Sequence, residues 1–191
     1  NVGFIDNTFN GLIDEPAMFK TPLTDAQVKA LYTAATNLNA PLGSVTVNSA
    51  NQVSVNKAVY ANTISLTADK VAIDTTNGAL NAAGGNVLIR PLTTNRAINL
   101  GTETAGSLSL TAAEISRITA NTLRIGDTAS GAITVSDALN FANANNVHLR
   151  SSGAVTETGS GSLAATNLAV TAGGAVTLGN AIKKGRIGHS Y

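Results

Sequence analysis

Short segments in which apolar and polar residues alternate recur along the chain from residue 44 to residue 180. Each covers three or four residues and has the period of two that is typical of β-strands. Gly, Asn, Asp or Thr occupies the gaps between them. The apolar pairs are Val45/Val47, Val53/Val55, Ile64/Leu66, Val71/Ile73, Val87/Ile89, Ile98/Leu100, Leu108/Leu110, Leu123/Ile125, Ile133/Val135, Val147/Leu149, Leu168/Val170 and Val176/Leu178.

The spacing of these pairs indicates a repeat array. Comparing every second pair gives steps from residue 45 to 64, 87 to 108, 147 to 168 and 155 to 176. The period is therefore about 19–25 residues, which is in the range of solenoid repeats. Leucine-rich repeats would need Leu at more fixed positions. Helical repeats would need a period of 3.6, and residues 111–118 show only a brief hint of one.

A parallel β-helix needs only what this pattern supplies. Its short strands point every other side chain inward, small residues fit its tight corners, and Asn or Gly adopts left-handed backbone there. Asn, Ser and Thr are expected to stack in ladders from coil to coil. We therefore predict an all-β, right-handed parallel β-helix over residues 44–180. At about 21 residues per coil and about 4.8 Å per strand, it would have about six or seven coils and a length of about 30 Å. Disorder is the alternative for so Gly- and Asn-rich a chain, but disordered segments lack regularly spaced Val and Ile.

Residues 1–36 have a different character. Three of the four Phe residues and the only Met lie there, and residues 37–43 form the predicted linker. Thr24 and Gln27 have the spacing of a capping box, which predicts one short α-helix over the following residues. Residues 11–19 (GLIDEPAMF) predict a strand that Pro16 places at an edge or a bulge. Residues 181–191 break the repeat pattern and are predicted to be a tail or a cut end.

Composition and charge exclude several function classes. The chain has 12 basic and 11 acidic residues, so it lacks the strongly basic surface that nucleic acid binding requires. No apolar run reaches the length of a membrane span. Cysteine is absent, which excludes disulfides, thiolate metal sites and a cysteine nucleophile. Aromatic residues make up only 4% of the chain, so the core is predicted to consist of Val, Ile, Leu and Ala.

The repeat region resembles a known family. Residues 106–126 (GSLSLTAAEISRITANTLRIG) and 131–135 (GAITV) are similar to the repeats of filamentous-haemagglutinin-like bacterial exoproteins, which are large secreted adhesins. The resemblance covers residues 44–180. It implies a β-helical stalk on the bacterial cell surface or in a secreted protein. The N-terminal secretion domain of that family is not visible here.

A second resemblance covers the beginning of the chain. Residues 9–15 (FNGLIDE) and 22–32 (PLTDAQVKALY) resemble the closing strand and short helix of a laminin-G-like or concanavalin-like jelly roll. We therefore expect the chain to begin inside a domain of a longer protein. The resemblance suggests Asp14 as a calcium ligand in the intact jelly roll, with help from Asp6 and Glu15, although Asp14 is also compatible with anchoring a turn. We expect no other cofactor.

The main enzymatic alternative is a β-helical polysaccharide lyase or hydrolase. Such enzymes use carboxylates from adjacent coils to bind calcium or to act as acid and base. Asp127, Asp137 and Glu157 each follow an apolar segment by two residues, so they are the candidates, although each also fits an exposed charge at a turn. Basic residues are few in this region, Arg124 and Arg150 being nearest.

Other candidates for catalysis are weak. His148 is predicted to point outward into solvent, and His189 has no evident partner in the tail. Tyr60 and Phe141 are the only aromatic residues of the array, where a sugar-binding groove usually offers several.

The expected function is therefore non-enzymatic. We expect a structural or adhesive segment of a secreted or surface-exposed bacterial adhesin, in which a rigid stalk follows a binding jelly roll. Its partners would be glycans or proteins of a host or neighbouring cell, and its cut ends would favour end-to-end self-association. A carbohydrate-active enzyme and a fragment without activity of its own remain the alternatives.

Overall fold

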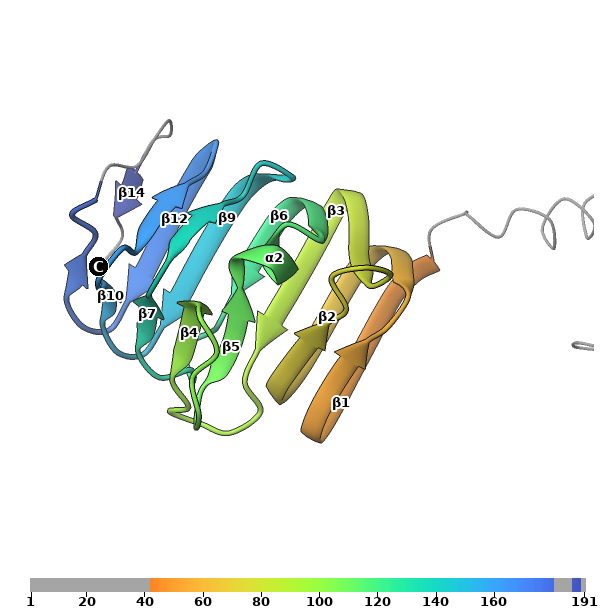
Figure 1. Cartoon of the computed structure of the whole chain (residues 1–191), viewed down its shortest axis with the longest axis horizontal. Coiled ribbons are helices and arrows are strands. Elements are labelled where there is room, and N and C mark those ends of the chain that lie inside the picture. The colour runs from red at the N-terminus through yellow and green to blue at the C-terminus, as the bar shows by residue number, and fades with distance from the viewer. Residues whose placement is uncertain (1–41, 181–186, 190–191) are drawn as a thin grey trace, which may run out of the picture. The chain divides into compact units, whose positions relative to one another are not determined.

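The computed structural model describes residues 42–180 and 187–189, which form a parallel β-solenoid of about six turns (Figure 1). These residues all belong to one compact unit of the chain, Asn39–Tyr191. The predicted jelly-roll end, with its helix after Thr24 and with Asp14, lies outside the described residues. The predicted all-β solenoid is confirmed, whereas its right-handed coiling stays a prediction.

The longest sheet runs along the whole solenoid and is parallel throughout. We call it the long sheet. Its strands, in spatial order, are β1 (Leu42–Val55), β2 (Ala58–Ile73), β3 (Ala79–Arg90), β6 (Ile118–Ile125), β9 (Ala144–Ser151), β12 (Asn167–Ala172) and β14 (Ile187–His189). The last strand lies in the segment that the sequence predicted to be a tail.

Two smaller sheets close the coils. A five-stranded sheet has the order β13 (Val176–Thr177), β10 (Val155–Glu157), β7 (Ile133–Val135), β4 (Ile98–Gly101) and β5 (Leu108–Thr111). A two-stranded sheet pairs β11 (Ser162–Ala164) with β8 (Ala138–Asn140). From β3 onward, the chain thus passes from the long sheet to the smaller sheets and back once per coil.

The strand register confirms three of the four predicted steps. Val45 pairs with Ile64 across β1 and β2. Val147 pairs with Leu168 across β9 and β12, and Val155 pairs with Val176 across β10 and β13. The first strands are longer than predicted, because β1 and β2 continue around the corner between two faces, with register shifts at the bends.

The step from residue 87 to 108 is wrong. Val87 pairs with Leu123 in the long sheet, whereas Leu108 pairs with Ile98 in the five-stranded sheet. The chain between β3 and β6 therefore contributes two strands to the smaller sheet. The second of these, β5, lies at the edge of that sheet and contacts β2.

The core is a narrow column of aliphatic side chains from successive coils. In residues 122–125 of β6 and 146–151 of β9, buried residues alternate with partly exposed ones, as a period of two requires. The largest fully buried side chains are Ile64, Leu80, Ile89, Ile98, Leu100, Leu108, Leu110, Ile118, Leu123, Ile125, Ile133 and Leu149. Phe141 also belongs to this core, whereas Tyr60 is exposed.

Neighbouring coils approach each other closely at the corners. Gly126 ends β6 with a positive φ of 79° and donates its N–H to the carbonyl of Ile89 at 2.8 Å. A Cβ atom on Gly126 would lie 2.2 Å from the carbonyl oxygen of Arg150 in the next coil. Only glycine satisfies both the dihedral angle and this contact.

The predicted side-chain ladder is present for asparagine. The amide nitrogen of Asn146 donates to the carbonyl of Asn121 at 3.0 Å, and that of Asn167 donates to the carbonyl of Asn145 at 3.0 Å. These bonds connect three successive coils at one corner of the long sheet. They satisfy backbone carbonyls that the turn leaves free of strand pairing.

The brief helical pattern at residues 111–118 forms a single turn, α2 (Ala112–Ile115). Thr111 caps it, and the Glu114 side chain completes a capping box. The Glu114 carboxylate is buried and also accepts the N–H of Ile73 at 2.9 Å. This turn therefore joins the end of β5 to the end of β2.

Candidate functional site

The outward side of the long sheet carries rows of polar residues. Inward neighbours such as Leu123 and Val147 are buried, so the residues between them point away from the core. We call this surface the polar face. Residues that are partners in the strand register form rows across this face. The first row is Thr63, Asn86, Thr122, Asn146 and Asn167, and the second is Ser65, Leu88, Arg124, His148 and Ala169. The third consists of two separate pairs, Thr67 with Arg90 and Arg150 with Thr171.

A shallow groove of about 460 Å³ lies on the polar face. Arg124 and His148 stand at one side of it, with Leu88 in its lining. The other lining residues are Thr63, Ser65, Asn86, Val87 and Thr122. The groove therefore combines hydroxyl and amide groups with one cationic side chain and one titratable side chain.

Arg124, His148 and Arg150 form a cluster, which we call the arginine cluster. Arg124 of β6 lies directly opposite His148 of β9, and Arg150 is two residues further along β9 on the same face. The Nε atoms of both arginines are buried and have no hydrogen-bond partner among the described residues. Neither arginine belongs to an ion pair formed by residues 42–180.

His148 is half-buried in this cluster, rather than freely solvated as predicted. Its Nε2 atom lies 2.9 Å from the Thr171 hydroxyl oxygen in the next coil. Burial lowers the pKa of His148, and the positive charges of Arg150 and Arg124 lower it further. Both effects favour the neutral form of the imidazole.

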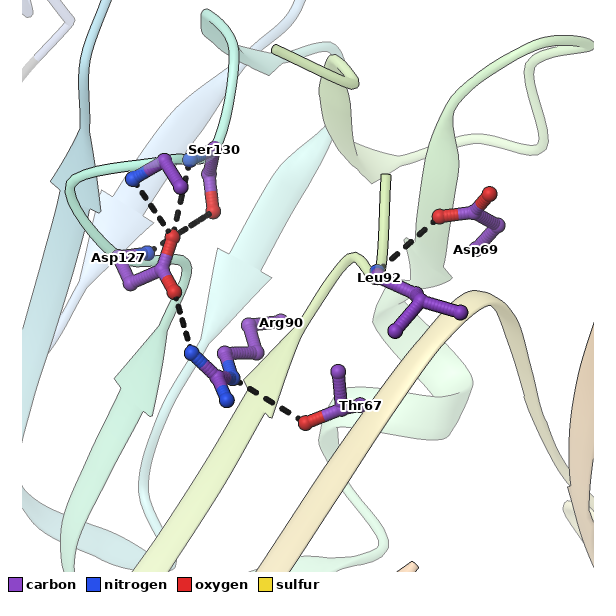
Figure 2. Close-up of polar contacts among 7 residues, drawn as sticks. Thr67, Asp69, Arg90, Leu92, Asp127 and Ser130 are labelled. Atoms are coloured by element: carbon purple, nitrogen blue, oxygen red, sulfur yellow. Dashed lines mark hydrogen bonds and ion pairs between the residues drawn. The ribbon is translucent and has the colours of Figure 1, made fainter. Parts of the chain in front are cut away.

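Asp127, a candidate for catalysis, is used to hold a loop (Figure 2). Its carboxylate accepts Arg90 Nη1 at 2.7 Å and the N–H and hydroxyl of Ser130, each at 2.9 Å. Arg90 in turn donates to the Thr67 hydroxyl at 3.1 Å, so the network spans three coils. Burial alone would raise the pKa of Asp127, but the bonds from Arg90 and Ser130 hold it below the ordinary value.

Asp69 has a similar anchoring role. Its carboxylate accepts the N–H of Leu92 at 3.1 Å (Figure 2) and the N–H of Thr93 at 2.8 Å, and these bonds fix the loop after β3. Although burial would raise the pKa of Asp69, these bonds and the charge of Arg96 lower it. Sequence reasoning did not single out this residue.

The strand register does not place the other two candidate carboxylates, Asp137 and Glu157, opposite each other. Glu157 pairs with Val135, two residues before Asp137, so the two acids are not strand partners. The Asp137 carboxylate accepts the N–H of Ala138, and the Glu157 carboxylate accepts the N–H of Asn180. Among residues 42–180, no group of three or more His, Cys, Asp or Glu side chains is arranged to hold a metal ion.

Sequence reasoning thus noticed the arginines but not their arrangement. Arg124 and Arg150 were considered as partners of nearby carboxylates, yet neither pairs with Asp127, Asp137 or Glu157. Their clustering follows from the pairing of Leu123 with Val147, which places Arg124 beside His148. Asp14 lies outside the described residues. For His189 the structure describes only the backbone, in β14.

Within the part of the chain that the structure describes, no helix has the length and apolar character needed to cross a membrane. No family model, curated protein or solved structure matches this chain.

Proposed function

We propose that this chain is a non-catalytic segment of a secreted or surface-exposed bacterial adhesin, in which a β-solenoid stalk displays the polar face. The observation that carries the proposal is the continuous parallel ladder from β1 to β14. The resemblance of residues 44–180 to filamentous-haemagglutinin-like repeats supports the same function. A jelly-roll part that precedes the stalk in the sequence remains part of the proposal.

A stalk of this kind is stiff because its interactions repeat. Every coil is hydrogen-bonded to the coils beside it, and one aliphatic column runs through them. Such arrays gain most of their stability from nearest-neighbour contacts. A binding surface built on this framework keeps its residues at fixed positions without a ligand.

The anchoring carboxylates favour a stalk over an enzyme. Asp127 and Asp69 accept several hydrogen bonds that hold loops between coils. Acid–base catalysis in a lyase or hydrolase would instead need carboxylates directed at a substrate groove. The groove on the polar face is lined by Arg124 and His148 and by no acidic residue.

The first coil offers a surface for end-to-end association. Among the described residues, β2 is the only strand neighbour of β1. Val45 and Val47 are only partly buried there, and they line a cavity of about 660 Å³ with Val53 and Ile64. An unpaired strand edge beside open apolar residues favours pairing with another coil.

This association gives a test of the proposed stalk. We expect the sedimentation coefficient of the 191-residue chain to rise with protein concentration. Val47→Lys should weaken the association at least fivefold, since it places a charge beside Val45, Val53 and Ile64 in the lining of this cavity. Thr46→Lys is the matched control, because Thr46 is exposed on the other side of the same strand.

Two results would count against the proposal. A monomer whose sedimentation does not change with concentration would remove the end-to-end stalk. Release of sugar reducing ends by the purified chain would favour the lyase or hydrolase. Beads coated with the chain should attach to glycan-bearing cell surfaces without such release.

A further inference from the structure

We infer that the arginine cluster and the adjoining groove bind the carboxylate groups of an acidic polysaccharide. This inference rests on the proposed function, since it names the ligand class of the same polar face. It concerns Arg124, His148 and Arg150 on two neighbouring strands.

The first argument is the charge arrangement. Neighbouring strands are about 4.8 Å apart, and residues two apart along a strand are about 6.6 Å apart. The Cα atoms of the three residues therefore lie within about 8 Å of one another. Like charges on neighbouring strands are unfavourable for the sheet, and an anion bound between them would offset this repulsion. Within residues 42–180 neither arginine has a carboxylate partner.

The second argument is the state of the guanidinium groups. The Nε atoms of Arg124 and Arg150 are withdrawn from solvent and donate to no acceptor among the described residues. A buried donor without an acceptor costs free energy. By contrast, Arg90 has its Nε on Thr67 and its Nη1 on Asp127. The two free guanidinium groups have the planar fork geometry that binds a carboxylate through two parallel hydrogen bonds.

The third argument concerns the rest of the ligand. The groove beside Arg124 is lined by the hydroxyls of Thr63, Ser65 and Thr122 and by the amide of Asn86. These groups donate to and accept from sugar hydroxyls. A protein partner would be expected to use large aromatic anchors, and single-stranded nucleic acid would need aromatic stacking platforms. The lining of this groove includes no Phe, Tyr or Trp, so it would hold a sugar through Arg124 and its hydroxyl and amide groups rather than by stacking on large aromatic rings.

The experiment measures binding of polygalacturonate to the 191-residue chain by isothermal titration calorimetry at low and physiological salt. Neutral dextran, dextran sulfate and single-stranded DNA are the comparison polymers. We expect saturable binding of polygalacturonate and none of dextran. The variant Arg124→Gln/Arg150→Gln should bind at least tenfold more weakly.

The matched control removes the same amount of charge elsewhere. Lys57 and Lys70 are exposed and lie outside the groove. Lys57→Gln/Lys70→Gln should therefore change the affinity less than twofold. Equal losses in both double variants would show attraction to net charge alone and would overturn the inference.

A second measurement needs no variant. Burial lowers the pKa of His148, and the charges of Arg150 and Arg124 lower it further. A carboxylate bound at the two arginines would offset the effect of these charges, so the pKa should rise when polygalacturonate is added. The charged groups facing His148 are Arg124 from β6 and Arg150 from its own strand, whereas β12 presents Thr171. NMR titration of the imidazole protons follows this change. An unchanged titration curve at saturating polymer would overturn the inference.

The remaining outcomes are also decisive. Tighter binding of dextran sulfate or of DNA would overturn the assignment to carboxylated sugars. Absence of binding, combined with intact end-to-end association, would remove the inference and leave the proposed stalk in place. Cleavage of polygalacturonate would instead remove the proposed non-catalytic function.

Discussion

Glu114 offers the sharpest test of how this solenoid is held together. It lies in the single helical turn α2, and its side chain is buried. Its carboxylate accepts the Ile73 N–H at 2.9 Å, the Thr111 N–H at 2.9 Å and the Thr111 hydroxyl at 2.8 Å. Because Ile73 ends β2 and Thr111 ends β5, one side chain terminates two strands that are far apart in the sequence.

The substitution Glu114→Ala should leave the N–H groups of Ile73 and Thr111 without this acceptor, the first in a buried and the second in a part-buried position. An unsatisfied buried donor costs about 1–3 kcal/mol. We therefore expect Glu114→Ala to lower the free energy of unfolding by about 2–5 kcal/mol, which is a large share of the about 5–15 kcal/mol of a typical domain. Glu114→Gln retains one acceptor oxygen and should lose about half as much.

Urea denaturation followed by far-ultraviolet circular dichroism measures the change, at one fixed protein concentration. Glu103→Ala is the matched control, since Glu103 is an exposed residue in the nearby loop between β4 and β5. Hydrogen exchange adds a local measurement: the Ile73 amide should exchange much faster in Glu114→Ala. Equal stability of Glu114→Ala and Glu103→Ala, with unchanged exchange at Ile73, would refute the role of this carboxylate.

Three further predictions test the corners, the loop anchors and the core. Both Gly126 and Gly84 have φ near 80°, but only at Gly126 does a backbone oxygen occupy the place where a Cβ would lie. In urea denaturation, Gly126→Ala should therefore lower the free energy of unfolding by more than about 1 kcal/mol beyond the effect of Gly84→Ala. The lowered pKa of Asp127 means that its carboxylate stabilises the fold above the unfolded pKa of about 3.9, and that this stability is lost as the pH falls through the folded pKa. In a plot of the free energy of unfolding against pH, Asp127→Asn should therefore flatten the acid limb, which is the fall in stability at low pH. A parallel acid limb in both proteins would contradict that anchor. Leu123→Ala, which opens a cavity in the core, should cost about 2–5 kcal/mol, whereas Leu92→Ala, at a side chain 47% exposed, should cost under about 1 kcal/mol; similar losses would contradict the assigned core.

The alternation of apolar residues was enough to predict the solenoid and much of its register. Val147 and Leu149 are buried as the pattern requires, and Val147 pairs with Leu168 as the spacing predicted. This works because a side chain in a strand points to one side or the other, and only the inner side is apolar. Local sequence therefore determines which residues enter the column.

The arginine cluster could not be derived in the same way. Arg124 and Arg150 are visible in the sequence, but their proximity depends on the pairing of β6 with β9, in which Arg124 lies opposite His148. A shift of the pairing by one residue would send one set of side chains to the other face. The site is thus a property of the register between coils.

The contact between Glu114 and Ile73 could not be predicted from the sequence either, because it depends on the position of β5 beside β2. The capping-box spacing of Thr111 and Glu114 predicts a helical turn but says nothing about a partner in β2. Glu114 reaches Ile73 because β5, at whose end Glu114 lies, contacts β2. This contact does not follow from the sequence order, in which β3 and β4 separate β2 from β5. A constant period, which led to the wrong step from residue 87 to 108, does not describe this coil.

The segment that contains β4 and β5, between β3 and β6, shows that the solenoid keeps the spacing between strands constant. β4 and β5 pair in parallel within one coil, and the loop between them is held by Asn99, whose amide nitrogen lies 2.6 Å from the Thr102 carbonyl and 2.8 Å from the Thr104 hydroxyl. Asn99 is itself buried, so the added loop brings its own polar network rather than disturbing the core. Coil length can therefore vary while each strand still finds a neighbour about 4.8 Å away. Because the strand spacing is preserved, the polar face remains continuous from β2 to β12, and the arginines of β6 and β9 keep their register despite the irregular coil before them.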